Sequence, residues 1–179
     1  MPSTYNEGLL TARRTKESDV QYTPKYAVTP LLEFLPPWEV TIWCPFDNDK
    51  SEYVKTFREH GYQVIATDIE HGEDFFKYEP IEPYDFIISN PPFSLKDDVL
   101  ARLVELAHPF AILLPLTALQ GQKRYKSLTN CQALIFDKRI SFWQNEDHTQ
   151  MKTQPAFASI YICKDFLPKD LEFRTLEEA

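Results

Sequence analysis

The segment from Asp85 to Phe93, Asp-Phe-Ile-Ile-Ser-Asn-Pro-Pro-Phe, ends in residues that could bind a planar amine. The carboxamide of Asn90 and the carbonyl of Pro91 can both accept hydrogen bonds from an exocyclic amino group. Phe93 could stack on a planar ring, while Pro91 and Pro92 hold the acceptors in place because each fixes its φ angle. The pattern predicts a site for an amine such as that of adenine. The alternative is a Pro-Pro turn that closes a strand, with Asn90 bonded to the backbone.

An apolar run at 86–88 leads into this segment and would position it. The run is too short for a helix and rich in β-branched residues, which favours a strand buried on both faces. Two consecutive prolines cannot continue a strand, because each lacks an N–H group. Asn90 therefore follows the carboxyl end of a buried strand, where open α/β sheets bind ligands.

Two further strands precede this one, and an acidic residue after them could hold a nucleoside. The pattern predicts a strand at 40–44, a loop at 45–49, a helix at 50–60 and a strand at 62–67. Asp68 follows the second strand, about 20 residues past the first loop, where a carboxylate can accept both ribose hydroxyls. The alternative is an ordinary surface aspartate.

Asn-Pro-Pro-Phe after an apolar strand resembles the catalytic signature of the S-adenosylmethionine-dependent adenine-N6 methyltransferases. Other motifs of that family occur in the same order, and the resemblance covers 21–163. It implies S-adenosyl-L-methionine as the cofactor and adenine in nucleic acid as the substrate, with DNA favoured over RNA. The implied catalytic residues are Asn90, Pro91, Pro92 and Phe93.

The resemblance also implies roles in cofactor binding. Tyr-Thr-Pro at 22–24 would contribute to the cofactor's amino-acid end, and Asp68 would bind the ribose. Asp74 would take the adenine amino group and Phe75 would pack on the ring. The full implied set is Tyr22, Thr23, Pro24, Cys44, Pro45, Phe46, Asp47, Asn48, Asp68, Ile69, Asp74 and Phe75.

The loop after the first strand departs from the family pattern. The family carries an acidic-Pro-x-x-Gly-x-Gly sequence there, whereas this chain has Cys-Pro-Phe-Asp-Asn-Asp at 44–49. Asn48 stands in the place of the first glycine, and asparagine tolerates the left-handed conformation. Cys44 replaces the acid, and Asp47 or Asp49 could supply a carboxylate from a shifted position.

The order of strands and helices predicts an α/β fold with a mostly parallel sheet and helices on both faces. Segments 139–143 and 157–162 alternate and predict an antiparallel hairpin at one edge. The resemblance implies the Rossmann-like class I methyltransferase fold. Residues 1–20 are interpreted as a flexible arm, and 21–179 as a single methyltransferase domain without a separate target-recognition domain.

Recognition of a target would depend on a few short segments. Loops at 116–122 and 144–154 offer the main room for it, so a protein partner or a second copy could supply specificity. Phe142 and Phe157 lie where the family has its target-base pocket. They could wall that pocket, although core packing is the more usual role of such residues.

The charge of the 179-residue chain is −8, which argues against nucleic-acid binding by the whole surface. Between residues 120 and 140, however, the sequence contains five basic residues and only one acidic residue. They form either a phosphate-contacting patch or an ordinary solvated helix face. These nucleic-acid contact candidates are Lys123, Arg124, Lys126, Lys138 and Arg139.

Other classes of protein are less consistent with the sequence. There is no apolar run near 18 residues and no apolar signal after Met1, so a cytoplasmic protein without a membrane partner is expected. The three cysteines lie far apart and give no metal-site spacing, so no metal is expected. The alternatives are an RNA adenine-N6 or protein glutamine methyltransferase, and an inactive methyltransferase-like scaffold that binds a protein partner.

Overall fold

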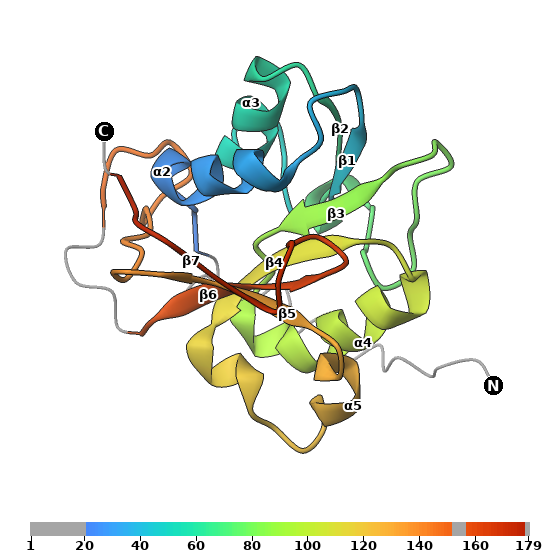
Figure 1. Cartoon of the computed structure of the whole chain (residues 1–179). Coiled ribbons are helices and arrows are strands. Elements are labelled where there is room, and N and C mark those ends of the chain that lie inside the picture. The colour runs from blue at the N-terminus through green and yellow to red at the C-terminus, as the bar shows by residue number, and fades with distance from the viewer. Residues whose placement is uncertain (1–20, 152–156, 178–179) are drawn as a thin grey trace.

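A seven-stranded sheet forms the centre of the computed structural model, which describes residues 21–151 and 157–177 (Figure 1). The strands lie side by side in the order β2-β1-β3-β4-β6-β5-β7. Their bounds are β1 (Thr41–Cys44), β2 (Gln63–Ala66), β3 (Phe86–Ser89), β4 (Phe110–Pro115), β5 (Gln132–Phe136), β6 (Ser159–Lys164) and β7 (Leu171–Arg174). The predicted N-terminal arm, 1–20, lies outside the described residues.

Strand directions confirm a mostly parallel sheet with an antiparallel strand toward one edge. β2, β1, β3 and β4 are parallel neighbours. β6 runs antiparallel to both β4 and β5, and β7 pairs in parallel with β5. The α/β class and the mainly parallel sheet follow the sequence-based prediction.

The predicted hairpin partner of the antiparallel strand is wrong. Residues 139–143 make only isolated bridges, and β6 pairs with β4 and β5 instead. The alternation at 139–143 arises because Ile140 and Phe142 are buried in the core. The backbone N–H of Ser141 donates to the hydroxyl of Tyr26 at 2.8 Å, and not to a neighbouring strand.

Helices cover both faces of the sheet, as predicted. In Figure 1, α2 and α3 lie above the sheet, and α4 and α5 lie below it. The helices are α2 (Lys25–Val28), α3 (Glu52–Glu59), α4 (Lys96–Leu106) and α5 (Tyr125–Leu128), with 3-10 turns η2 (Thr29–Phe34), η3 (Ile69–His71), η4 (Phe93–Leu95) and η5 (Leu116–Leu119). No helix within the two described ranges is long and apolar enough to cross a membrane.

The central strands are apolar because both of their faces are covered. Ile87 and Ile88 of β3 are fully buried, and so are Phe110 to Leu114 of β4. Since β1 to β4 are parallel, their carboxyl ends meet at one edge of the sheet. The amino end of antiparallel β6 reaches the same edge. The loops after β1, β2, β3 and β4 therefore surround a common region, which contains the candidate site.

Candidate functional site

Asn90 directly follows β3 and has one half of its carboxamide held in place. Its Nδ2 donates to the carbonyl of Gln21 at 2.6 Å and to Thr23 Oγ1 at 3.0 Å. A backbone carbonyl can only accept, so this contact fixes which end of the amide is nitrogen. Asn90 Oδ1 is buried and has no hydrogen-bond partner among the described residues. The site therefore presents one fixed, unsatisfied acceptor, a state that costs about 1–3 kcal/mol without a ligand.

Phe93 is largely buried, so little of its ring is exposed for stacking on a base. It is 8% exposed and packs edge-on against Phe142 and Phe157, with ring centroids 6.1 and 5.4 Å away. Phe142 is buried in the core, whereas Phe157 is only partly buried. Pro91 is buried, and Pro92 begins the η4 turn. The three phenylalanines thus form a hydrophobic wall close to Asn90.

Asp47 joins the loop after β1 to the end of β3. Its carboxylate accepts hydrogen bonds from Ser51 Oγ at 2.5 Å and from Ser89 Oγ, and Ser89 is the last residue of β3. Its backbone N–H donates to the Thr67 carbonyl at 3.1 Å. Burial raises the pKa of Asp47 to about 6, although both serine hydrogen bonds act in the opposite direction. Asp47 therefore connects the loop after β1 to the end of β3 through its carboxylate, and to the residue after β2 through its backbone N–H.

Asp47 is the carboxylate of this loop that lies partly buried at the end of the strands, whereas Cys44 and Asp49 are placed differently. The proposed contact of Asp47 to the cofactor stays a prediction. The Cys44 thiol is fully buried, and burial raises its pKa well above the ordinary value, so it stays neutral. Asp49 is exposed and pairs with Arg58 at 2.7 Å. Pro45 is buried beneath the loop.

The predicted left-handed conformation of Asn48 is wrong. Asn48 is not among the described non-glycine residues with positive φ. Its Oδ1 accepts from the backbone N–H of Lys50 at 2.9 Å, and its carbonyl accepts from the N–H of Ser51 at 3.0 Å. These bonds turn the chain through ordinary backbone angles, so the loop closes without glycine.

The acidic residues after β2 stabilise turns. Asp68 Oδ1 accepts from the backbone N–H of His71 at 2.9 Å and contacts its ring Nδ1 at 2.7 Å, which raises the pKa of His71. Ile69 begins the η3 turn capped in this way. Asp74 Oδ1 accepts from the backbone N–H of Phe76 at 3.1 Å. Their proposed contacts to a ribose and an adenine stay predictions.

Phe75 is committed to the core. It is 2% exposed, and its ring lies 5.5 Å from that of Trp43 and 4.9 Å from that of Phe46. Phe46 is only partly buried. Of this aromatic pair, Phe46 offers the more accessible ring to a ligand.

A cavity of about 70 Å³ connects three of the predicted elements. It brings together the Tyr-Thr-Pro segment, the loop after β1 and Asn90. Its lining residues are Gln21, Tyr22, Thr23, Phe46, Asp47, Asn48, Lys50, Ser51, Glu52, Asn90, Glu146 and His148. Pro24, which follows the lining residue Thr23 in the chain, is buried and does not itself line the cavity. Asp68, Asp74 and Phe75 do not line it either.

Sequence reasoning missed two residues that close this cavity, Glu146 and His148. Glu146 accepts from Asn48 Nδ2 at 2.9 Å and from Lys50 Nζ at 2.7 Å, and these bonds lower its pKa. His148 Nδ1 lies 3.1 Å from a carboxylate oxygen of Glu52. A drug-sized ligand occupies a pocket of about 300–1,000 Å³, so with Glu146 and His148 in these positions the cavity is smaller than such a ligand requires.

Arg124, one of the five candidates for a phosphate contact, uses most of its hydrogen-bond donors within the protein. Its guanidinium pairs with Asp97 and donates to the carbonyls of Ala118, Thr117 and Gln120. These bonds use most of its five donors, so Arg124 stabilises the turn before α5. Lys123 and Lys126 are exposed on either side of it, and Lys138 and Arg139 are exposed after β5.

No group of three or more His, Cys, Asp or Glu side chains in 21–151 and 157–177 could hold a metal ion. Comparison with known proteins finds no matching family model and no matching curated protein. The function must therefore be argued from the geometry of the site.

Proposed function

We propose that this protein transfers a methyl group from S-adenosyl-L-methionine to the N6 amino group of adenine in nucleic acid, with DNA favoured over RNA. The observation that carries the proposal is the buried, unpaired Oδ1 of Asn90 beside the cavity. An acceptor held in this way suits an exocyclic amino group, which can donate to it.

The fold supports this proposal at a coarser level. A mostly parallel sheet with one antiparallel strand near its edge and helices on both faces is compatible with a Rossmann-like class I methyltransferase. The carboxyl edge of such a sheet is the usual ligand-binding edge. Asn90 and Asp47 both follow strands at that edge.

The cofactor-binding role is proposed for residues whose chemistry fits S-adenosyl-L-methionine. Asp47 offers a carboxylate to the ammonium of the amino-acid end, beside Tyr22 and Thr23. Asp68 offers acceptors for the ribose hydroxyls at the end of β2, and Phe46 offers a ring face. When bound, the cofactor supplies a methyl group on a sulfonium, which is already strongly electrophilic. The polar and aromatic lining of the cavity suits this cofactor, but the cavity is too small for it unless Glu146 is displaced.

The protein's own contribution would be to orient the amine and exclude water. Asn90 Oδ1 and the Pro91 carbonyl would accept the two N–H bonds of the amino group, which makes its nitrogen more tetrahedral. These acceptors would also stabilise positive charge as it develops on that nitrogen. Thr23 and the Gln21 carbonyl hold the Asn90 amide beforehand, so little reorganisation is needed. A base in a duplex would have to flip out to reach the site.

Mass spectrometry of nucleosides tests the proposal directly. The protein is incubated with cofactor and with unmethylated DNA or RNA, and N6-methyl-2′-deoxyadenosine from DNA or N6-methyladenosine from RNA is quantified. We expect Asn90→Ala to lower transfer by about 10²–10³-fold while cofactor binding is retained. Gln63→Ala, which removes an exposed amide at the start of β2, is the matched control. Near-normal turnover by Asn90→Ala would contradict the mechanism.

A second candidate is an inactive methyltransferase-like scaffold that binds a protein partner. The contacts of Glu146 with Asn48 and Lys50, which close the cavity, favour it. Calorimetric titration with S-adenosyl-L-methionine separates the two, because only the enzyme requires binding. If binding occurs without nucleic-acid methylation, a glutamine amide in a protein is the next substrate to test, since it carries the same donor group.

A further inference from the structure

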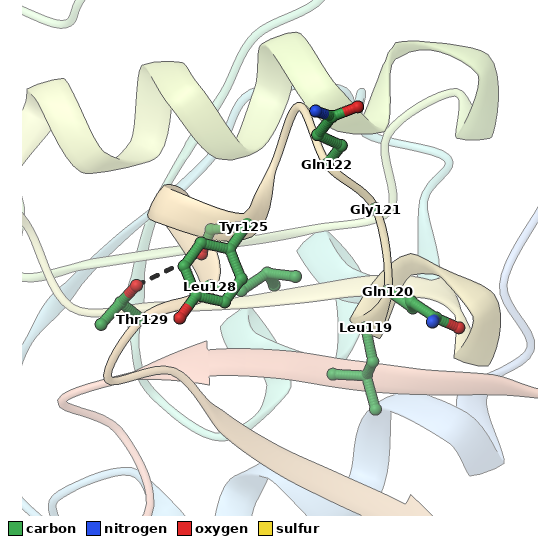
Figure 2. Close-up of a pocket in the computed structure, with 7 residues that line it drawn as sticks. All are labelled: Leu119, Gln120, Gly121, Gln122, Tyr125, Leu128 and Thr129. Atoms are coloured by element: carbon green, nitrogen blue, oxygen red, sulfur yellow. Dashed lines mark hydrogen bonds between the residues drawn. The ribbon is translucent and has the colours of Figure 1, made fainter.

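A second and larger hollow lies between η5 and α5 (Figure 2). Its volume is about 540 Å³, within the usual range of ligand pockets. We call it the Tyr125 hollow, and it is lined by Leu119, Gln120, Gly121, Gln122, Tyr125, Leu128 and Thr129. The mechanism proposed above uses none of these residues.

The hollow combines an exposed ring with neutral hydrogen-bonding groups. Tyr125 is 73% exposed and Leu119 is 43% exposed. Figure 2 shows the Tyr125 ring in front of Leu128, with the amides of Gln120 and Gln122 extending from the adjoining loop. Exposed aromatic rings stack on nucleobases, and glutamine amides can both donate to and accept from base edges.

The segment that forms the hollow carries basic side chains but no acidic ones, and its Arg124 pairs with Asp97 of α4. Residues 116–131 contain no acidic side chain, in a chain whose net charge is −8. Lys123 and Lys126 lie on either side of Tyr125 in sequence, and both are exposed. Proteins that bind single-stranded nucleic acid combine exposed aromatic rings with nearby cations in this way.

Arg124 makes the rim of the hollow rigid. Its Nε donates to the Ala118 carbonyl at 2.7 Å, and its guanidinium pairs with Asp97 of α4. A Cβ atom added at Gly121 would lie 2.5 Å from the guanidinium carbon, so the loop closes tightly over Arg124. Such a rim loses little conformational freedom on binding.

A short path joins this hollow to the candidate active site. Phe157 packs on Phe93, and the carbonyl of the next residue, Ala158, accepts from the N–H of Leu116 at 2.9 Å. Leu116 begins η5, and Leu119, which ends it, lines the hollow. Four residues of 3-10 helix span about 8 Å. Leu116 is itself 43% exposed, so apolar surface continues along this path.

We infer that the Tyr125 hollow binds an unstacked nucleotide of a single-stranded nucleic-acid segment. The base stacks on Tyr125, and the neighbouring phosphates contact Lys123 and Lys126. This inference rests on the nucleic-acid substrate of the proposed function, and it adds a contact surface outside the catalytic pocket.

Fluorescence anisotropy with a labelled single-stranded oligonucleotide, without cofactor, tests the inference on the full chain. Tyr125→Ala should weaken binding about tenfold, the lower part of the range for loss of one stacked base. Tyr125→Phe should restore it. Phe173→Ala, which removes another exposed ring from edge strand β7, is the matched control and should bind like the wild type. Tyr125 is exposed, so thermal unfolding of the variant should be unchanged.

Salt dependence tests the phosphate contacts separately. Lys123→Gln/Lys126→Gln should lower the slope of log affinity against log salt by about 1.4, because each contact to a single strand contributes about 0.7. Lys55→Gln/Lys169→Gln makes the same charge change elsewhere and should leave the slope closer to that of the wild type.

Several outcomes overturn the inference. These are absent oligonucleotide binding by the wild type, equal effects of Tyr125→Ala and Phe173→Ala, and loss of self-association in Tyr125→Ala without a change in oligonucleotide affinity. The last would identify the hollow as an interface between copies. Binding that depends on Tyr125 but comes without any methyl transfer would support the inference and contradict the proposed function.

Discussion

The side chains of Thr23 and Asn90 meet in a 3.0 Å hydrogen bond although 67 residues separate them in the chain. Thr23 also bonds to Tyr53, whose hydroxyl shares a 2.7 Å bond with that of Tyr161. Tyr161 Oη donates to the Ala27 carbonyl at 3.0 Å. A hydroxyl has one proton, and Tyr161 donates its proton to the carbonyl of Ala27, so it must accept the hydrogen bond from Tyr53. The donors in this series of hydrogen bonds therefore point from Asn90 toward β6. The direct partners of Asn90 are the Gln21 carbonyl and Thr23, and a line of hydroxyl groups extends from Thr23 to β6.

Thr23→Val tests this orientation, because valine keeps the shape of threonine and removes its hydroxyl. Asn90 Nδ2 then retains only the Gln21 carbonyl. We expect the kcat of methyl transfer to fall roughly five- to tenfold, as the loss of about 1 kcal/mol from one hydrogen bond implies. Cofactor affinity, measured by calorimetry, should change less. The exposed Thr29→Val is the control, and unchanged kcat in Thr23→Val would show that Gln21 alone suffices.

The raised pKa of Asp47 leads us to expect a cofactor affinity that depends on pH. Its pKa of about 6 lies above the ordinary value of 3.8, because burial disfavours the charged form. A cationic ligand binds the ionised form, so affinity should be constant above pH 6 and fall up to tenfold per pH unit below it. Calorimetry at several pH values checks this. Asp47→Asn should bind weakly at every pH, and a wild-type affinity independent of pH between 5 and 7 would exclude Asp47 as the partner of the ammonium.

The same raised pKa makes Asp47 unfavourable for stability. The folded state binds the proton of Asp47 more tightly than the unfolded chain does. The contribution of Asp47 to the free energy of unfolding therefore falls as the pH rises from about 4 to about 6. One pKa unit corresponds to about 1.4 kcal/mol, so the stability of Asp47→Asn relative to the wild type should rise by up to about 3 kcal/mol between pH 4 and pH 8, on top of a pH-independent cost from the serine hydrogen bond that Asn cannot accept. Urea unfolding measures the difference between variant and wild type. Asp49→Asn, at an exposed position, is the matched control for the substitution itself.

The sheet was predictable because burial on both faces requires continuous apolar runs, as at Ile87 and Ile88 of β3. Once the strands are parallel, Asn90, Asp47 and Asp68 must gather at one edge. The sequence alone therefore predicted β1, β2 and β3 and the edge of the sheet at which the candidate site lies, but it did not predict β7. It assigned residues 139–143 to a strand because alternate burial of side chains does not require backbone pairing.

The closure of the cavity was not predictable in the same way. Glu146 lies in a polar segment without periodicity, and its partner Asn48 is 98 residues away. For Arg124 the sequence left a phosphate contact and a solvated helix face open, and neither pattern showed that backbone carbonyls would surround its guanidinium. Such contacts depend on the tertiary path of a loop, which local patterns do not specify.

Glu146→Gln should make the cavity easier to open. The variant removes the charge that pairs with Lys50, a partly exposed ion pair that contributes about 0–1 kcal/mol. We expect cofactor affinity to rise about two- to fivefold in calorimetry, and the gain to shrink at high salt, where the wild-type pair is screened. Glu82→Gln, at an exposed position before β3, serves as the control. A loss of affinity would mean that Glu146 binds the ligand and does not oppose it.

Tyr161→Phe tests whether the buried hydroxyl chain stabilises the fold that carries the site. The variant leaves the Ala27 carbonyl without its donor and Tyr53 without its acceptor, in the buried contact between β6 and α3. Unsatisfied buried groups cost about 1–3 kcal/mol, and we expect urea unfolding to show a loss in this range. Tyr125→Phe, which removes an exposed hydroxyl, should leave stability unchanged. Because Thr23 and Asn90 keep their own bond in Tyr161→Phe, methyl transfer by the folded variant should stay within a few-fold of the wild type. A stability equal to that of the wild type would show that the two tyrosine hydroxyls contribute no net stabilisation.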